Sequence, residues 1–233
     1  MQIGDILNPK VVILLAGMGS RLGRPHPKSL TQLGNGETIL SRQLRILSGL
    51  GLEIHAVVGF KMEQIMEAAP ELLFAYNPNY DTTNTSKSLL KGLIYMDEDV
   101  LWLNGDVVFE PEIIEMMIAS ETSAVAVNNA RVAEEEVKYT LNNDGYINVI
   151  SKEVKGALGE ALGINLIKKE YLADFKAKLD LVDDNDYFER GMELLIEEKG
   201  NVFKAVDVGS LGCVEVDFSD DLDEARKMVK ESK

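Results

Sequence analysis

Cysteine and histidine are scarce in this chain of 233 residues. Cys213 is its single cysteine, which excludes an internal disulfide and a cysteine-rich metal site. Neither of the two histidines stands in a serine–histidine–aspartate or cysteine–histidine pattern. The sequence therefore gives no indication of an activated protein nucleophile or of a histidine-based metal site.

Basic residues are also in short supply. The chain has 24 lysines and arginines against 39 acidic residues, which gives a formal net charge of −15. Nucleic acids and anionic membranes attract basic surfaces, so we expect this chain to bind neither of them. A phosphorylated ligand would have to be held by a few placed cations, by helix N-termini or by a metal ion.

Long apolar segments are missing as well. No apolar run approaches the roughly 18 residues that a membrane span needs. The first residues, MQIGDILNPK, lack the cationic and apolar regions of a secretory signal peptide. These absences predict a soluble, cytoplasmic protein.

The residues that are abundant indicate an α/β fold with an aliphatic core. Hydrophobic residues make up 45% of the chain and aromatic residues only 6%. Apolar runs bounded by glycine alternate with helical patterns, so we predict strands at 10–15, 54–58, 74–77, 99–103 and 123–128, and helices at 38–49, 62–69, 88–95 and 111–120. This order predicts a Rossmann-like, mostly parallel sheet with helices on both faces.

After about residue 130 the pattern changes to a small α+β portion. Two apolar runs flank Asn142-Asn-Asp-Gly145, which predicts a hairpin of residues 137–141 and 146–150. We further predict strands at 159–167, 203–206 and 213–216, and helices at 171–179, 186–198 and 220–230. No repeat or linker separates the two parts, so we expect a single domain over residues 1–233, with halves of about 1–130 and 131–233.

A glycine-rich turn follows the first predicted strand, in VVILLAGMGSRLGRPHPK (11–28). Glycines allow a positive φ and let backbone N–H groups approach an anion. The spacing of Gly17, Gly19 and Gly23 departs from the dinucleotide fingerprint, so the glycines alone also fit a plain tight loop. Arg21 and Lys28 add two cations to this segment, which favours a phosphate ligand.

These residues resemble the L-A-A-G-x-G-x-R…P-K signature of the nucleotidyltransferase family, which activates sugar phosphates and polyol or amino-alcohol phosphates. Four further segments are similar to that family: NPNYDTTNTSKSLLKGL (77–93), LNGDVVF (103–109), ISKEVKGALGEALGI (150–164) and CVEVDFSDDLDEARKM (213–228). The resemblance is closest to the small cytidylyltransferases that act on phosphocholine, inositol phosphate or aminophosphonates. It implies the GT-A-like variant of the predicted fold, with a nucleotide-binding first half and an acceptor-binding second half.

The resemblance implies roles for residues around a nucleoside triphosphate. Arg21 would contact the β- and γ-phosphates and Lys28 the α-phosphate, unless both are solvated surface cations. Ser88, which we expect at a helix start, would lie on the base side, and the alternative for it is a plain N-cap. Asn84 would lie on the same side, and the alternative for it is an Asx turn. The full nucleotide-binding set that we expect is Leu15, Ala16, Gly17, Met18, Gly19, Ser20, Asn84, Ser88 and Asn104.

Two aspartates are the expected ligands of Mg²⁺. Asp106 and Asp217 follow predicted strands, and we expect those strands to be neighbours in the sheet. A turn residue and a helix N-cap are the structural alternatives for the two. Glu215 shares one strand face with Asp217 and is a candidate neighbour of the metal site.

The acceptor-side residues implied by the resemblance are Lys152, Glu160, Tyr187, Phe188 and Glu189. Lys152 would bind the acceptor phosphate. The aromatic–acid stretch of residues 187–189 resembles the lining of a choline pocket, which would suit a quaternary ammonium group. A buried helix face is the alternative for that stretch.

The reaction implied is transfer of CMP from CTP to a small phosphorylated or phosphonate acceptor, with Mg²⁺, release of pyrophosphate and no covalent enzyme intermediate. A homodimer is left open. One alternative is a sugar-1-phosphate nucleotidyltransferase using UTP, dTTP or GTP, although S-K-E at 151–153 replaces the E-K-P of that branch. The other alternative is a non-catalytic nucleotide-sensing scaffold, but Lys28, Asp106 and Asp217 are all present.

Overall fold

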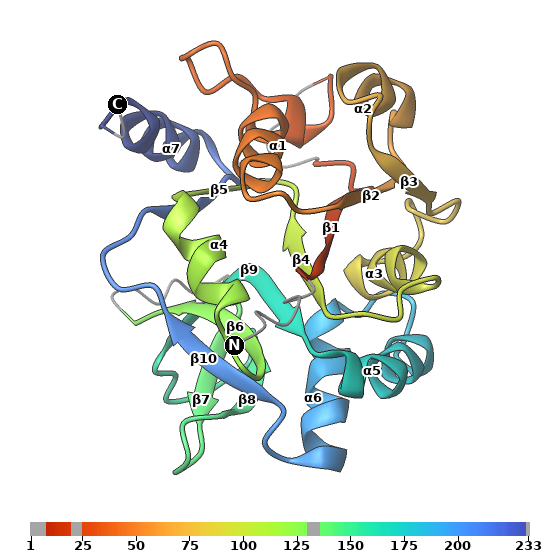
Figure 1. Cartoon of the computed structure of the whole chain (residues 1–233), viewed down its shortest axis with the longest axis vertical. Coiled ribbons are helices and arrows are strands. Elements are labelled where there is room, and N and C mark those ends of the chain that lie inside the picture. Colours follow the sequence, from red (N-terminus) through yellow and green to blue (C-terminus); the bar gives the residue numbers. More distant parts are fainter. Residues whose placement is uncertain (1–7, 20–24, 130–135, 232–233) are drawn as a thin grey trace, which may run out of the picture.

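A large mixed sheet forms the centre of the molecule (Figure 1). The structure is a computed structural model, which describes residues 8–19, 25–129 and 136–231. The strand order is β10-β6-β9-β4-β1-β2-β3, and β7 and β8 join it through β9. The strands are β1 (Lys10–Leu15), β2 (Ile54–Val58), β3 (Leu73–Tyr76), β4 (Val100–Asn104), β6 (Ser123–Asn128), β7 (Lys138–Leu141), β8 (Ile147–Ser151), β9 (Gly159–Ile167) and β10 (Phe203–Asp207).

Most pairs along this path are parallel, as predicted. β1 pairs in parallel with β2 and β4, β2 with β3, and β6 with β10. β9 is antiparallel to both β4 and β6 and lies between them (Figure 1). The second half of the chain is therefore built into the sheet of the first half.

Helices cover both faces of the sheet, which confirms the predicted fold class. The face reached by Val11 and Ile13 is covered by α1 (Ile39–Gly49), α2 (Met62–Ala68) and α4 (Pro111–Ile118). The face reached by Val12 is covered by α3 (Thr85–Leu93), α5 (Lys169–Leu181) and α6 (Phe188–Lys199). Alternate residues of one buried strand thus feed two cores, as the period-two side-chain geometry of a strand requires.

One predicted helix start was wrong and one strand was not predicted, and both differences affect the site. α3 begins at Thr85, three residues before the predicted start at Ser88, because Asn84 caps it and leaves Ser88 in the first turns. A short strand, β5 (Val107–Phe109), was not predicted, because it follows β4 after a turn of only two residues.

Contrary to the prediction, the strands before Asp106 and Asp217 are not neighbours in the main sheet. β11 (Cys213–Glu215) pairs antiparallel with β5 in a separate two-stranded sheet, and does not lie beside β4. The last helix, α7 (Ser219–Glu231), packs on this small sheet through a core that includes Val108, Val216 and Leu222. Among the residues that the structure describes, no helix is both long and apolar enough to cross a membrane.

Candidate active site

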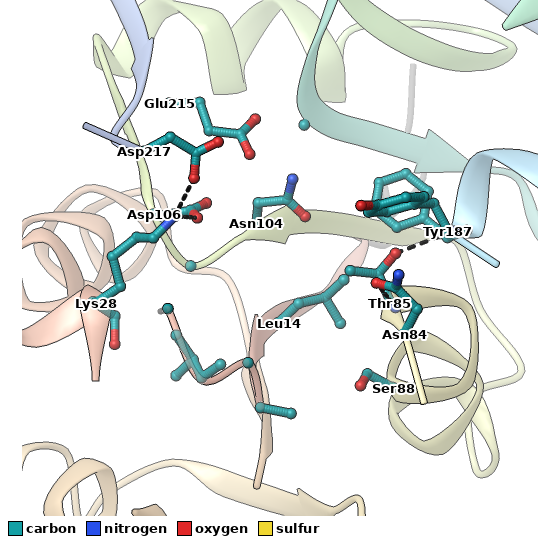
Figure 2. Close-up of a pocket in the computed structure, with 18 of the residues that line it drawn as sticks. Leu14, Lys28, Asn84, Thr85, Ser88, Asn104, Asp106, Tyr187, Glu215 and Asp217 are labelled. Carbon is teal, nitrogen blue, oxygen red and sulfur yellow. Dashed lines mark hydrogen bonds and ion pairs between the residues drawn. The ribbon is translucent and has the colours of Figure 1, made fainter. Parts of the chain in front are cut away.

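A pocket of about 320 Å³ opens at the carboxyl ends of β1 and β4. Its lining comes from the glycine turn, the start of α3, the β4–β5 turn, the start of α6 and the end of β11. In Figure 2 the side chains of Lys28, Asp106 and Asp217 lie on one side of this space, and Asn84, Ser88 and Tyr187 lie on the other. Parallel α/β sheets bind ligands at this edge, so the position agrees with the prediction.

The glycine turn approaches Lys28 closely. Gly19 has φ of +58°, and a Cβ at this position would lie 3.1 Å from Cβ of Lys28. Gly17, Ala16 and Leu15 also line the pocket, whereas Met18 is 47% exposed and is not among the described lining residues. The turn therefore presents backbone, with little side chain, to the pocket. The predicted residues Ser20 and Arg21 lie outside the described residues.

A tight turn carries Asp106 into the pocket. The N–H of Gly105 donates to the carbonyl of Leu14 at 3.0 Å, and a Cβ on Gly105 would lie 2.3 Å from Cδ2 of Leu15. The N–H of Val216 donates to the carbonyl of Asp106 at 3.0 Å. These contacts bring the turn after β4 beside the residues that follow β11, although the two are about a hundred residues apart in the chain.

Three carboxylates meet at this point. One oxygen each of Asp106, Glu215 and Asp217 lies within 4.8 Å of the others. Nζ of Lys28 donates to Oδ2 of Asp106 at 2.7 Å and to Oδ1 of Asp217 at 2.5 Å. Burial opposes the charged ammonium, but the two aspartates outweigh burial and raise the pKa of Lys28. Burial, together with the carboxylates of Asp106, Asp217 and Glu136, raises the pKa of Glu215 well above its ordinary value.

This cluster fits a divalent cation bound through oxygen. Three carboxylates face a single ammonium, so negative charge is left unbalanced when all of them are ionised. Within the described part of the chain, Oδ1 of Asp106 is buried and has no hydrogen-bond partner. Buried acceptors without partners are costly, and carboxylate oxygens are the ligands that Mg²⁺ prefers. Asp221 accepts from the N–H groups of Asp217 and Phe218, so it ties the residues that follow β11 to the start of α7.

The start of α3 forms the opposite wall. Oδ1 of Asn84 accepts from the N–H of Thr85 at 2.8 Å, and its Nδ2 donates to the carbonyl of Asn185 at 3.1 Å. Ser88 is buried, and its Oγ accepts from Nδ2 of Asn77 at 3.0 Å. Asn84, and not Ser88, is therefore the helix N-cap. Asn104, at the end of β4, lies between this wall and the carboxylates (Figure 2).

The structure brings Lys152, Tyr187 and Glu189 together. Nζ of Lys152 lies 4.9 Å from the ring centroid of Tyr187, which is 40% exposed. Glu189 is 8% exposed, and among the described residues its Oε2 has no hydrogen-bond partner. Burial raises the pKa of Glu189 to about 7. A buried carboxyl with one oxygen lacking a hydrogen-bond partner, beside an exposed aromatic ring, can receive a cationic ligand group.

The other two predicted acceptor residues, Phe188 and Glu160, differ in their position relative to the pocket. Phe188 lines the pocket, but it is only 2% exposed and its ring packs edge-on against Trp102 with centroids 5.8 Å apart, so its side chain is also part of the core. Glu160 is not among the described lining residues, whereas Ala161 and Gly163 are. Side chains alternate along β9, so Glu160 points to the sheet face opposite to theirs.

Sequence reasoning missed eleven of the described lining residues, and Thr85 and Glu136 are two of them. Thr85 lines the pocket, and its Oγ1 accepts from the N–H of Phe188 at 3.1 Å, which joins the starts of α3 and α6. Glu136 lines the pocket near Glu215. The helix-capping signal at Asn84 could have pointed to Thr85, but no local pattern indicates Glu136.

Known proteins with similar sequences include two that are longer than this chain. CMP-5'-(3-aminopropyl)phosphonate synthase of Streptomyces rubellomurinus is 30% identical over 236 residues, which cover 91% of this chain and 37% of that protein. Bifunctional protein GlmU of Methanococcus maripaludis is 28% identical over 215 residues, which cover 88% of this chain and 49% of that protein. The chain thus spans less than half the length of either relative.

Two solved structures of cytidine nucleotide transferases have the same fold as this chain. The inositol-1-phosphate CTP transferase of T. maritima has a TM-score of 0.79 at 17% identity, covering 96% of this chain and 97% of its own. The CTP:phosphocholine cytidylyltransferase of Streptococcus pneumoniae has a TM-score of 0.77 at 18% identity, covering 96% of this chain and all of its own. Residues 11–176 match the MobA-like NTP transferase domain. The chain therefore belongs to the family of MobA-like NTP transferase domains, which confirms the resemblance read from its motifs.

Proposed function

We propose that this chain is a cytidylyltransferase that transfers CMP from CTP to a small phosphorylated or phosphonate acceptor. The observation that supports it most strongly is the meeting of Lys28 with three carboxylates in a pocket walled by a glycine turn. Such a site has groups for both the anionic triphosphate and its cation. Its described lining contains no cysteine or histidine, and in the proposed reaction the acceptor's own oxygen attacks the α-phosphorus and pyrophosphate leaves.

The triphosphate is held by backbone and by cations. Amides of Gly17 and Gly19 face the phosphates, Arg21 binds the β- and γ-phosphates, and Lys28 binds the α-phosphate, where charge builds up during transfer. Asp106 and Asp217, with Glu215 beside them, hold Mg²⁺, which when bound offsets negative charge on the phosphate oxygens. The work of the protein is mainly to position the two substrates in line.

The base lies between the glycine turn and α3, where Ser88 and Asn84 line the pocket. A pocket bounded this way suits a pyrimidine better than a purine. Cytosine has an amino donor at its 4-position where uracil has an acceptor, so backbone carbonyls favour CTP. Leaving one buried polar group unpaired costs roughly 1–3 kcal/mol, which is about tenfold to a hundredfold in selectivity.

The acceptor has an anionic end and a cationic end. Lys152 binds the phosphate or phosphonate, and Oε2 of Glu189, which has no hydrogen-bond partner among the described residues, binds an amine beside the ring of Tyr187. The name of the Streptomyces relative contains both an aminopropyl group and a phosphonate, which supports an acceptor of this class. An aminoalkyl phosphonate or amino-alcohol phosphate is therefore the acceptor that we propose.

A screen of pyrophosphate release tests the proposal. The four nucleoside triphosphates are each combined with amino-alcohol phosphates, aminoalkyl phosphonates, polyol phosphates and sugar-1-phosphates, with Mg²⁺ throughout. We expect turnover with CTP and an amine-bearing acceptor. The Asp106→Asn variant, in which the side chain keeps its shape but loses its charge, is the inactive control. Turnover with a sugar-1-phosphate and UTP, dTTP or GTP would place the chain in the sugar branch. Binding without turnover would indicate a nucleotide sensor.

A further inference from the structure

Helix α1 carries two polar side chains on its buried side. Arg42 is 5% exposed and Gln43 is 1% exposed. Ile39 and Leu47 lie one turn before and after Gln43 and are fully buried, so Gln43 occupies a core position of the helix. A buried amide is costly unless its hydrogen bonds are made. Oε1 of Gln43 has no hydrogen-bond partner among the described residues, so the partners of its Nε2 indicate what the side chain does.

Gln43 holds the turn that carries Asp106. Its Nε2 donates to the carbonyl of Asn104 at 3.0 Å and to the carbonyl of Val107 at 2.8 Å. These two carbonyls flank Gly105 and Asp106, so one side-chain amide spans the whole turn. Because both amide hydrogens are used, the turn is fixed at each of its ends.

The same helix holds the far end of β5. Nη2 of Arg42 donates to the carbonyl of Phe109 at 3.2 Å. β5 pairs with β11 in a register that sets Val107 opposite Glu215, and the N–H of Val216 donates to the carbonyl of Asp106. Contacts from α1 to β5 therefore influence the positions of all three carboxylates, because β5, the strand that α1 holds, pairs with β11.

We infer that Gln43 is a positioning residue for the cation site, acting on Asp106 through the turn it spans. The inference rests on the proposed function, in which the cation is Mg²⁺. Gln43 touches neither the carboxylates nor a substrate in this arrangement. Without its two hydrogen bonds the turn can relax, and the carboxylate of Asp106 loses its place beside Glu215 and Asp217.

The test is Gln43→Met, which keeps the length of the side chain and removes both donors. Binding of Mn²⁺ alone to the whole purified chain is followed by electron paramagnetic resonance. The dissociation constant for Mn²⁺ should rise about tenfold to a hundredfold, as for other residues that orient metal ligands. In turnover assays the Mg²⁺ concentration for half-maximal rate should rise, whereas the KM for CTP at saturating Mg²⁺ should change little. Gln64→Met, the same change on α2 away from the pocket, is the matched control.

A second variant and the unmodified chain distinguish failure of the positioning role from failure of the metal assignment. Gln43→Glu has the same size but replaces the Nε2 donor with oxygen, so it should weaken Mn²⁺ binding in the same direction. Unchanged Mn²⁺ affinity in a folded Gln43→Met protein would overturn the positioning role. Loss of folding in both variants would overturn it too, because Gln43 would then be a determinant of stability. Failure of the unmodified chain to bind Mn²⁺ would instead refute the metal assignment in the proposed function.

Discussion

Lys28 shows how one residue can serve two states of a site. In the structure its ammonium lies between Asp106 and Asp217, with only 12% of its side chain exposed. A divalent cation bound by these carboxylates would take over the neutralisation that Lys28 provides. Lys28 would then be free to turn to the α-phosphate, which gains charge only during transfer. The residue is therefore expected to act mainly on the rate of the chemical step.

The variant Lys28→Met should lower kcat by about a hundredfold to a thousandfold, the range seen when one donor to a developing charge is removed. The KM for CTP should change far less, because the ground-state triphosphate keeps its other contacts. Steady-state kinetics at saturating Mg²⁺ measure both constants, with Lys227→Met, an exposed lysine of α7, as the control. A raised KM with an unchanged kcat would make Lys28 a docking cation only.

Glu189 should give the protein a distinctive dependence on pH. Its pKa is near 4.5 when exposed and about 7 in the fold, so the folded state keeps a proton that the unfolded chain releases. The unfolding free energy should therefore fall as pH rises from about 4.5 to 7, and then level off. At about 1.4 kcal/mol per pKa unit, the fall should be on the order of 3 kcal/mol. Urea unfolding of the wild type and Glu189→Gln at pH 4.5 and 8 measures this difference.

The same titration affects the acceptor. Ionised Glu189 attracts an amine and the protonated form does not, so the KM for an amine-bearing acceptor should fall as pH rises through about 7. Glu189→Gln should remove this part of the pH profile. Parallel stability and KM profiles for the two proteins would contradict both the raised pKa and the role in binding an amine.

At the scale of elements, the start of α3 is tied to the loop before α6. The N–H of Asn84 donates to the carbonyl of Asp184 at 2.7 Å, and the N–H of Ser86 donates to that of Asp186 at 3.4 Å. Nζ of Lys87 donates to three carbonyls at the end of α5: those of Leu179, Asp180 and Val182. The wall proposed for the base is thus joined directly to the segment that carries the proposed acceptor residues.

Lys87→Met should lower the unfolding free energy by about 1–2 kcal/mol. A cation at a helix C-terminus stabilises the terminal carbonyls, and these lose a charged donor in the variant. Urea unfolding measures the change, and Lys91→Met, an exposed lysine on the same helix, is the matched control. Equal effects of the two variants would show that the tie between α3 and α5 adds nothing to stability.

At the scale of the whole molecule, the two halves of the chain share one sheet and one aromatic cluster. β9 of the second half lies between β4 and β6 of the first. Trp102 on β4 is fully buried and contacts Phe175, Phe188 and Phe203, with centroids 5.3, 5.8 and 6.5 Å away. The first half cannot complete its sheet without the second, so the halves are not expected to fold separately.

Unfolding should therefore be a single transition. Trp102, the one tryptophan, reports on the contact between the halves, and far-UV circular dichroism reports on the helices of both. Urea curves from the two signals should coincide, as a two-state transition requires. Two separated transitions would contradict the single domain over residues 1–233.

Much of the fold was predictable because its signals are local. The strands at 10–15, 54–58, 123–128 and 159–167 have the predicted bounds, since each consists mainly of apolar residues and is bounded by polar residues or glycine. β5 was missed because three residues are too few to show a period. The start of α3 was misplaced because a serine and an asparagine are both good N-caps, and only the backbone chooses between them.

The sequence by itself indicated the family, the glycine turn, and Lys28, Asp106 and Asp217 as candidate site residues, because these depend on residue type and short motifs. Only the tertiary structure decided which strands bring Asp106 and Asp217 together, that Phe188 packs in the core while Glu189 is a buried carboxyl of the pocket wall, and that Gln43 spans the turn that carries Asp106. Those facts come from contacts between residues about sixty to a hundred positions apart. Such contacts depend on how whole elements pack, and hydrophobic periodicity records only which face of each element is buried.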